Sequence, residues 1–259
     1  MCAGVLAGVL LAGCSGGDGA LPDAPEAGAS EESGAPEGGG GLDFVLDPDR
    51  VPQDVPAAVE LVRAVTADPE AYGPDYVAQE PAETDPAGWA VLDADCAWQR
   101  EPLPDGVLAS LTRYAELPAE DGAGPVRVSA VVTVHRDTRG AEWEMARSVE
   151  DALRCPDQQL RTDEWVTGLL SLGFSQGTLG NDYAEDFLTE AGEFHSDVLG
   201  GPHTFEWTRG RLGPVTFAVS ARGAEGRTPQ EISEAGTRAA GSMATRIQQV
   251  LEADEEDRA

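Results

Sequence analysis

The chain has 259 residues, of which 41% are hydrophobic, enough to bury the core of one ordinary domain or two small ones. Asp and Glu number 47 against 17 Lys and Arg, which gives a formal net charge of −30, and the sequence contains no lysine. Because nucleic-acid backbones are bound through basic side chains, this balance excludes nucleic acid as an expected partner, and the lack of lysine excludes Schiff-base, P-loop and protein-kinase chemistry.

The first element in chain order is a short apolar segment that ends at a cysteine. Residues 3–12 (AGVLAGVLLA) are too few to span a bilayer, which takes about 20 residues, and their length is typical of a secretory signal. The sequence Leu11-Ala12-Gly13-Cys14 then resembles the lipobox of bacterial lipoproteins. The resemblance implies a signal peptide over residues 1–13, a lipid on Cys14, and anchoring to the extracytoplasmic face of the cell membrane.

The segment after the anchor differs sharply in composition from the rest of the chain. Residues 14–41 consist mostly of Gly, Ala, Ser, Pro and acidic residues, which cannot bury enough apolar surface to offset the entropy of ordering. We expect a disordered acidic tether here.

Residues 42–88 are expected to hold an N-terminal helix and an irregular connection. Asp54 and Pro56 are typical of a helix start, and an apolar repeat follows at Val55, Val59, Val62 and Val65. The stretch 68–88 is rich in proline and acid, which favours irregular structure.

The main domain is predicted to span residues 89–253. Residues 126–136 alternate apolar and polar side chains, which predicts a strand with one buried face in an antiparallel sheet. Runs over 203–209 and 215–222 predict a hairpin. Residues 141–155 predict a helix whose buried stripe comprises Trp143, Ala146, Val149 and Leu153, flanked by Met145 and Ala152.

The last predicted helix has the clearest start signal. Thr228-Pro229-Gln230-Glu231 is a capping box with proline in the first turn, and an apolar stripe runs from Ile232 through Ala235, Ala239, Met243 and Ile247 to Val250. This order of elements predicts an α+β fold with helices packed on one face of an antiparallel sheet. Residues 254–259 are expected to form a disordered acidic tail.

Four cysteines allow a simple assignment. Cys2 lies in the predicted signal peptide and Cys14 is the predicted lipid site, which leaves Cys96 and Cys155 as an even pair in a secreted domain. We therefore predict a Cys96–Cys155 disulfide. Neither cysteine has a CxxC spacing or a nearby histidine, so a metal site at this pair is not expected. No cofactor is predicted for the chain.

Two stretches carry a further resemblance. CAWQREPLPDGVLASLTRYAELPA (96–119) and WEMARSVEDALRCPDQQL (143–160) resemble uncharacterised actinobacterial lipoproteins, and residues 89–252 are more loosely similar to PknH-like extracellular sensor domains. The second resemblance implies a disulfide-bonded α+β domain with a cleft for an unidentified ligand. Such domains usually carry two disulfides, whereas this chain has one cysteine pair available.

Three hypotheses for the function follow. The first is a non-enzymatic lipoprotein that binds a small molecule or a protein outside the membrane, with Trp98, Trp165 and Trp207 as candidate ligand contacts. The second is a secreted serine hydrolase, because residues 173–177 (GFSQG) match GxSxG, with Ser175, Asp186 and His203 in hydrolase order. The third is a passive envelope or assembly component. A metal site formed by Glu193, His195, Asp197 and His203 is a further alternative that no fixed spacing supports.

Overall fold

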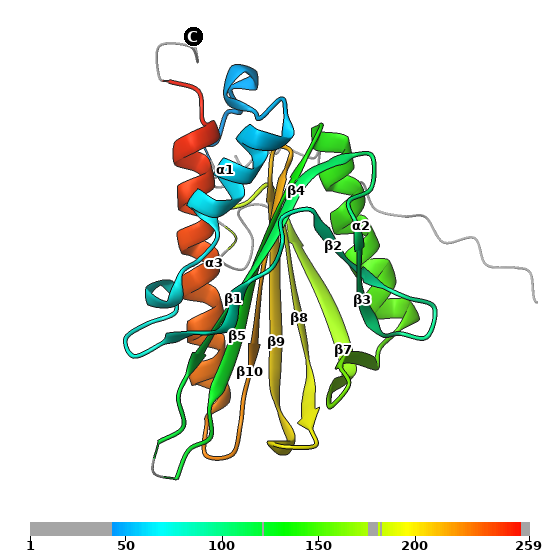
Figure 1. Ribbon diagram of the computed structural model, residues 1–259, viewed down its shortest axis with the longest axis vertical. Helices are drawn as coiled ribbons and strands as arrows, with labels where there is room; N and C mark the ends of the chain where they lie inside the picture. The colour runs from blue at the N-terminus through cyan, green and yellow to red at the C-terminus, as the bar shows by residue number, and fades with distance from the viewer. Residues whose placement is uncertain (1–42, 121, 176–180, 182, 255–259) are drawn as a thin grey trace, which may run out of the picture. The chain divides into compact units, whose positions relative to one another are not determined.

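A computed structural model (Figure 1) describes residues 43–120, 122–175, 181 and 183–254, which belong to one compact unit. The predicted signal peptide, the lipid site Cys14, the tether and residues 255–259 lie outside the described residues. No helix in the described ranges has the length and apolar character needed to cross a membrane.

Within the described residues, eight strands form one antiparallel sheet in the order β1-β4-β5-β10-β9-β8-β7-β6. A separate two-stranded hairpin joins β2 to β3. The strands are β1 (Val77–Glu83), β2 (Gly88–Leu92), β3 (Trp98–Pro102), β4 (Val107–Leu117), β5 (Val126–His135), β6 (Gln158–Arg161), β7 (Glu164–Ser175), β8 (Asp186–Ser196), β9 (Gly200–Leu212) and β10 (Val215–Arg222). The α-helices are α1 (Val55–Val65), α2 (Thr138–Arg154) and α3 (Pro229–Leu251).

The main core lies between one face of the sheet and helices α1 and α3. Alternate residues of β5, from Val126 to Val134, are buried against both helices together with Phe217 of β10. Helix α3 begins at the predicted capping box, where the Thr228 hydroxyl accepts the Glu231 N–H and the Glu231 carboxylate accepts the Thr228 N–H. The predicted strand, hairpin and last helix are therefore confirmed.

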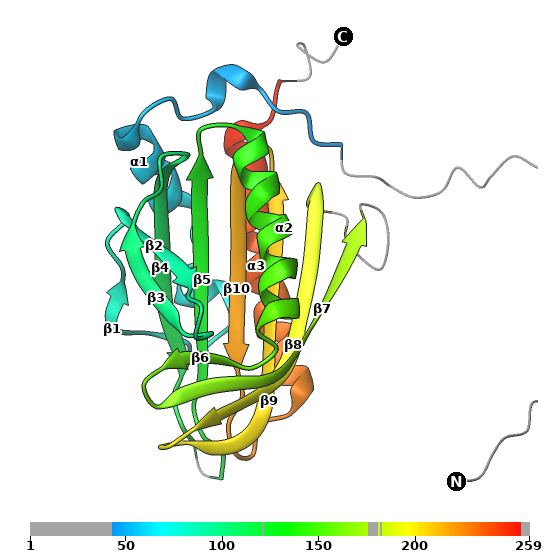
Figure 2. The same cartoon turned by 90° about the vertical axis from the view of Figure 1, so that its right-hand side faces the viewer.

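Helix α2 lies on the opposite face of the sheet, which Figure 2 shows with α2 in front and α3 behind. The α+β class, the antiparallel sheet and the disulfide are confirmed, but the helices cover both faces instead of one. The face under α2 is polar: Glu144 of α2 accepts hydrogen bonds from Thr216 of β10 and lies 2.7 Å from His135 Nε2.

The predicted buried stripe of α2 is wrong in position. Its buried residues are Ala141, Met145, Ser148 and Ala152, whereas Trp143 is 65% exposed and Leu153 is 80% exposed. The reason is that α2 covers a polar sheet face, where small and polar side chains pack, so the largest apolar groups point outward.

The Pro-rich stretch 68–88 also differs from expectation. It contains β1, which pairs with β4 through Val77 opposite Glu116 and Ala78 opposite Ala115, and closes one edge of the sheet. Proline has no backbone N–H to donate to a neighbouring strand. Pro81 is accommodated because β1 is an edge strand, whose outer side has no neighbour to accept such a bond.

Candidate functional site: a cleft between the β2–β3 hairpin, α2 and the sheet

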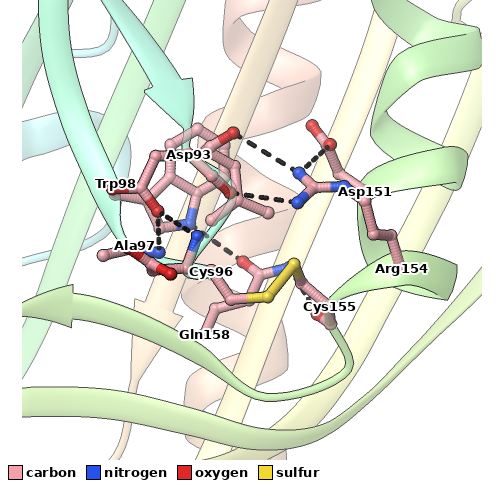
Figure 3. Close-up of a disulfide and its surroundings, with 10 residues drawn as sticks. Asp93, Cys96, Ala97, Trp98, Asp151, Arg154, Cys155 and Gln158 are labelled. Carbon is pink, nitrogen blue, oxygen red and sulfur yellow. Dashed lines mark hydrogen bonds and ion pairs between the residues drawn. A yellow bond between two sulfur atoms is a disulfide. The ribbon is translucent and has the colours of Figure 1, made fainter.

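The hairpin is fastened to the end of α2 by covalent and polar contacts. Cys96 and Cys155 form the predicted disulfide, with their Cα atoms 5.6 Å apart (Figure 3). Beside it, Arg154 donates to the Asp93 carbonyl at 3.0 Å, and the Trp98 indole N–H donates to Gln158 Oε1 at 2.9 Å. Because an isolated two-stranded hairpin is barely stable in water, these contacts fix its position over the sheet.

A first chamber of about 280 Å³ lies between this hairpin, α2 and the polar sheet face. Trp89 and Trp98 of the hairpin line one wall, α2 supplies Glu144 and Ser148, and Trp207 of β9 lies in the sheet wall. The mixture of aromatic surface with a few placed polar groups is typical of small-molecule sites.

Trp207 is held rigidly within that wall. Its ring meets Trp98 at a centroid distance of 5.3 Å and an interplanar angle of 60°, and the Arg209 guanidinium lies 3.6 Å from the Trp207 ring centroid. Arg209 is itself fixed by an ion pair of 2.8 Å with Glu190, whose side chain is buried. These contacts fix the orientation of the Trp207 ring in the chamber wall.

A second chamber of about 230 Å³ adjoins the first and shares Ala90, Trp98, Val131 and Trp207 with it. Its lining adds hydroxyl groups and arginines: Thr112, Tyr114, Ser129, Ser220, Arg100, Arg161 and Arg222. The two chambers, together called the cleft below, adjoin at these shared residues and differ in chemistry.

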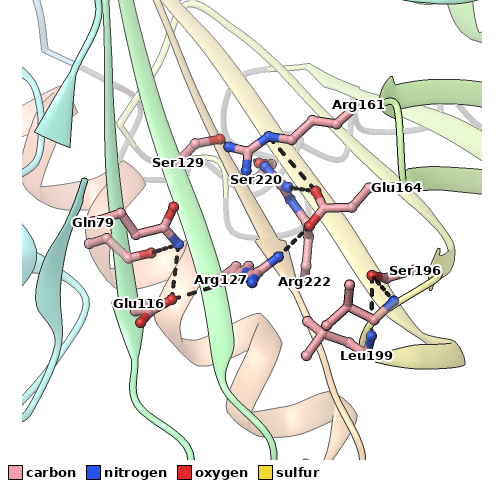
Figure 4. Close-up of polar contacts among 12 residues, drawn as sticks. Gln79, Glu116, Arg127, Ser129, Arg161, Glu164, Ser196, Leu199, Ser220 and Arg222 are labelled. Atoms are coloured by element: carbon pink, nitrogen blue, oxygen red, sulfur yellow. Dashed lines mark hydrogen bonds and ion pairs between the residues drawn. The ribbon is translucent and has the colours of Figure 1, made fainter. Parts of the chain in front are cut away.

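Three arginines from different strands converge on one buried carboxylate at the second chamber (Figure 4). Glu164 of β7 is 1% exposed; it accepts from Arg127 of β5 and, at 2.6 Å, from Arg222 of β10. Arg161 lies farther away, at 3.9 Å. Burial lowers the pKa of the Arg222 guanidinium, while the Glu164 carboxylate acts in the opposite direction.

The structure brings together two of the three predicted ligand contacts. Trp98 and Trp207 touch each other and line both chambers. Trp165 lines neither chamber; it stacks on His195 with an interplanar angle of 4°. Trp89 of the hairpin also lines the first chamber.

The three hydrolase candidates do not come together. Ser175 pairs with Asp186 at the end of the β7–β8 ladder, and Asp186 pairs with Arg211. His203 instead pairs with Phe194 and its Nε2 lies 3.0 Å from the Leu199 carbonyl. The eight strand positions from 203 to 211 correspond to about 26 Å along β9, too far for a nucleophile–base hydrogen bond.

The metal alternative is likewise not assembled. His195 Nε2 lies 2.9 Å from the Thr167 hydroxyl, while His203 contacts a backbone carbonyl. Across the described part of the chain, no three His, Cys, Asp or Glu side chains form a group that could hold a metal ion.

Sequence reasoning missed the arginines and Glu164. The available signal is the recurrence of hydroxyl residues at alternate positions on neighbouring strands, which places Thr112, Ser129 and Ser220 on one sheet face. β10 is buried on both faces yet carries Thr216, Ser220 and Arg222 on one of them, and such a strand indicates a covered polar face.

No protein-family model matches the chain, and no curated protein matches it. Among solved structures, it is similar to the crystal structure of the extracellular domain of PknH from Mycobacterium tuberculosis, with a TM-score of 0.47 and 11% sequence identity. The similarity covers 73% of this chain and 96% of that chain.

Proposed function

We propose that the protein is a non-enzymatic lipoprotein, anchored through Cys14, whose extracytoplasmic domain binds a small ligand in the cleft. The observation that carries the ligand-binding part is the pair of contacting indoles, Trp98 and Trp207, at the junction of two chambers. Preformed concave surfaces with aromatic walls and convergent polar groups are the usual form of ligand sites.

The disulfide supports the extracytoplasmic address. Bonds of this kind persist in oxidising compartments and are rare in the cytosol of most organisms. Cys155 is 1% exposed and its partner Cys96 lies in the turn of the hairpin, so the bond serves the fold and joins two walls of the cleft. The charge of −30 makes a nucleic-acid ligand a poor fit.

The ligand-binding part is tested with a matched pair of tryptophan variants. Aromatic compounds of naphthalene size should raise the melting temperature of the purified protein and of Trp143→Ala, whose ring is 65% exposed on α2 and lines no part of the cleft. Trp98→Ala should lose the shift, because it removes the wall common to both chambers. Equal shifts in all three proteins contradict binding in the cleft.

The anchor is tested by metabolic labelling with an alkyne fatty acid. The wild type and Cys2→Ala should be labelled and should fractionate with membranes, because the thioether forms at Cys14. Cys14→Ala should carry no label and leave the membrane fraction. Equal labelling of Cys14→Ala and wild type contradicts the lipid anchor.

A further inference from the structure

The second chamber is positively lined in a strongly acidic protein. Arg100, Arg161 and Arg222 line it, and no Asp or Glu among the described residues does. The first chamber, in contrast, is balanced, since Glu144, Glu150 and Asp151 face Arg147, Arg154 and Arg209. The chain has a net charge of −30, so a local excess of guanidinium groups arises only because the fold gathers arginines that are far apart in the sequence.

One of these arginines has an unused donor. The Arg222 side chain is 8% exposed and its Nη1 is bound to Glu164, but its Nε–H has no hydrogen-bond partner among the described residues. A buried donor left unpaired typically costs about 1–3 kcal/mol, more when it is charged, so such a group in a native structure calls for a partner.

The nearby charges do not neutralise the cluster. Glu164 is shared by Arg127, Arg161 and Arg222, and Glu116 approaches Arg127 only at 3.9 Å. Arg161 is 43% exposed, with its closest carboxylate oxygen also at 3.9 Å. Even with both carboxylates counted, three guanidinium groups face two negative charges, and Arg100 adds a further positive one.

Hydroxyl groups complete the lining. The Ser129 and Ser220 hydroxyls lie 2.7 Å apart and share one hydrogen bond, which leaves one hydroxyl hydrogen free to donate to a third group. Arginine forks and hydroxyl donors together are the groups that proteins use for oxyanions, because the planar guanidinium matches two oxygens at once.

We propose that the second chamber binds an oxyanion, a carboxylate or a phosphate monoester, carried by a ligand whose flat apolar part lies against Trp98 and Trp207. This inference rests on the proposed ligand-binding function and adds the chemical class of the ligand. The ligand is thus an aromatic or similarly flat anion. Its charged end would accept hydrogen bonds from Arg161, Arg222 and a serine hydroxyl.

Three probes of matched shape test the proposal: 2-naphthoate, 2-naphthyl phosphate and the neutral 2-naphthamide. Their dissociation constants are measured at constant ionic strength by calorimetry on the full chain carrying Cys14→Ser, so that no lipid is attached. We expect at least one anion to bind about tenfold or more tightly than the amide, the effect of one hydrogen bond to a charged group.

Two arginine variants locate the effect. Arg161→Gln should weaken the preferred anion about tenfold and leave the amide unchanged, because only the anion uses the guanidinium. Its folding should be preserved, since the Arg161 side chain is 43% exposed and its ion pair with Glu164, the only one it makes among the described residues, is long at 3.9 Å. Arg139→Gln, at an exposed position of α2 outside both chambers, is the control and should bind every probe as the wild type does.

The outcomes separate the two proposals. Preference for 2-naphthoate assigns a carboxylate ligand, and preference for 2-naphthyl phosphate assigns a phosphate monoester. If the amide binds as tightly as the anions, or Arg161→Gln and Arg139→Gln behave alike, the anion site is wrong while the ligand-binding cleft stands. If no probe binds, both are overturned.

Discussion

Glu164 is the residue on which the charge balance of the cleft depends. It lies on β7, is 1% exposed, and holds Arg127 and Arg222 at hydrogen-bonding distance across the sheet. A buried ion pair adds little net stability compared with an apolar replacement, because desolvation offsets most of the attraction. Removing one partner alone is different, since it leaves the other charge buried without compensation.

Glu164→Gln should therefore be strongly destabilising. We expect a loss of about 3 kcal/mol in the free energy of unfolding, measured by urea titration, because the Arg222 guanidinium then stays buried without a counter-charge. Glu83→Gln is the matched control: Glu83 pairs with Arg113 at 3.2 Å but its side chain is 37% exposed, so its loss should cost less than about 1 kcal/mol. If the two variants lose the same free energy of unfolding, Glu164 is not a buried, ionised carboxylate in the folded protein.

At the scale of elements, the two faces of α2 differ: one lines the cleft and the other is exposed to solvent. Its inward face carries Met145 and Ser148 toward the cleft, and its outward face carries Trp143 and Leu153. The apolar stripe of α2 is not its buried face, because the sheet under the helix carries polar residues among its apolar ones, such as Ser110, Thr133 and Thr216.

This arrangement predicts unequal effects for two serine substitutions on α2. Met145→Ser should lower the free energy of unfolding by about 2–4 kcal/mol, because the side chain is 7% exposed and its loss removes buried apolar contacts and enlarges the first chamber. Leu153→Ser, at 80% exposure, should stay within about 0.5 kcal/mol of the wild type. Urea titrations of both variants provide the check, and a reversed order would contradict the orientation of α2.

The elements that sequence could predict are those specified by neighbouring residues. The capping box at Thr228 and Glu231, the hairpin signal around Gly213 and the alternation along β5 are all local patterns, and each formed as expected. β8 was not predicted, because its sequence DFLTEAGEFHS mixes glycine and acid, and its buried Glu190 pairs with Arg209 on the next strand.

In the candidate site too, features set by neighbouring residues could be predicted, and contacts between distant segments could not. The Cys96–Cys155 pair could be assigned by elimination, but nothing near Trp98 in the sequence indicates that its ring meets Trp207 of β9. That contact depends on the disulfide placing the hairpin over the sheet. The arginines that converge on Glu164 were missed for the same reason, since Arg127, Arg161 and Arg222 come from three strands and only the folded sheet brings them to one carboxylate.

At the scale of the whole molecule, the domain combines a large sheet with a small hairpin. The hairpin strands do not pair with strands of the large sheet. β2 and β3 pair with each other alone among the described strands. The links to the rest near the turn are the disulfide, the Arg154 bonds to the Leu92 and Asp93 carbonyls, the Trp98–Gln158 bond and a single bridge between Ala97 and Gln159.

Reduction of the disulfide should therefore act first on the hairpin. By the chain-entropy relation, closing a loop with a sequence separation of 59 stabilises the domain by about 4 kcal/mol, which Cys96→Ser with Cys155→Ser should remove. Hydrogen exchange adds the location of the effect. In the double variant, amides of 88–102 should exchange through local opening, much faster than those of β5 and β10, because the core of those strands is packed by α3 and contains neither cysteine. If the acceleration is the same in the hairpin and in β5, the bond stabilises only the whole fold and does not fix the wall of the cleft.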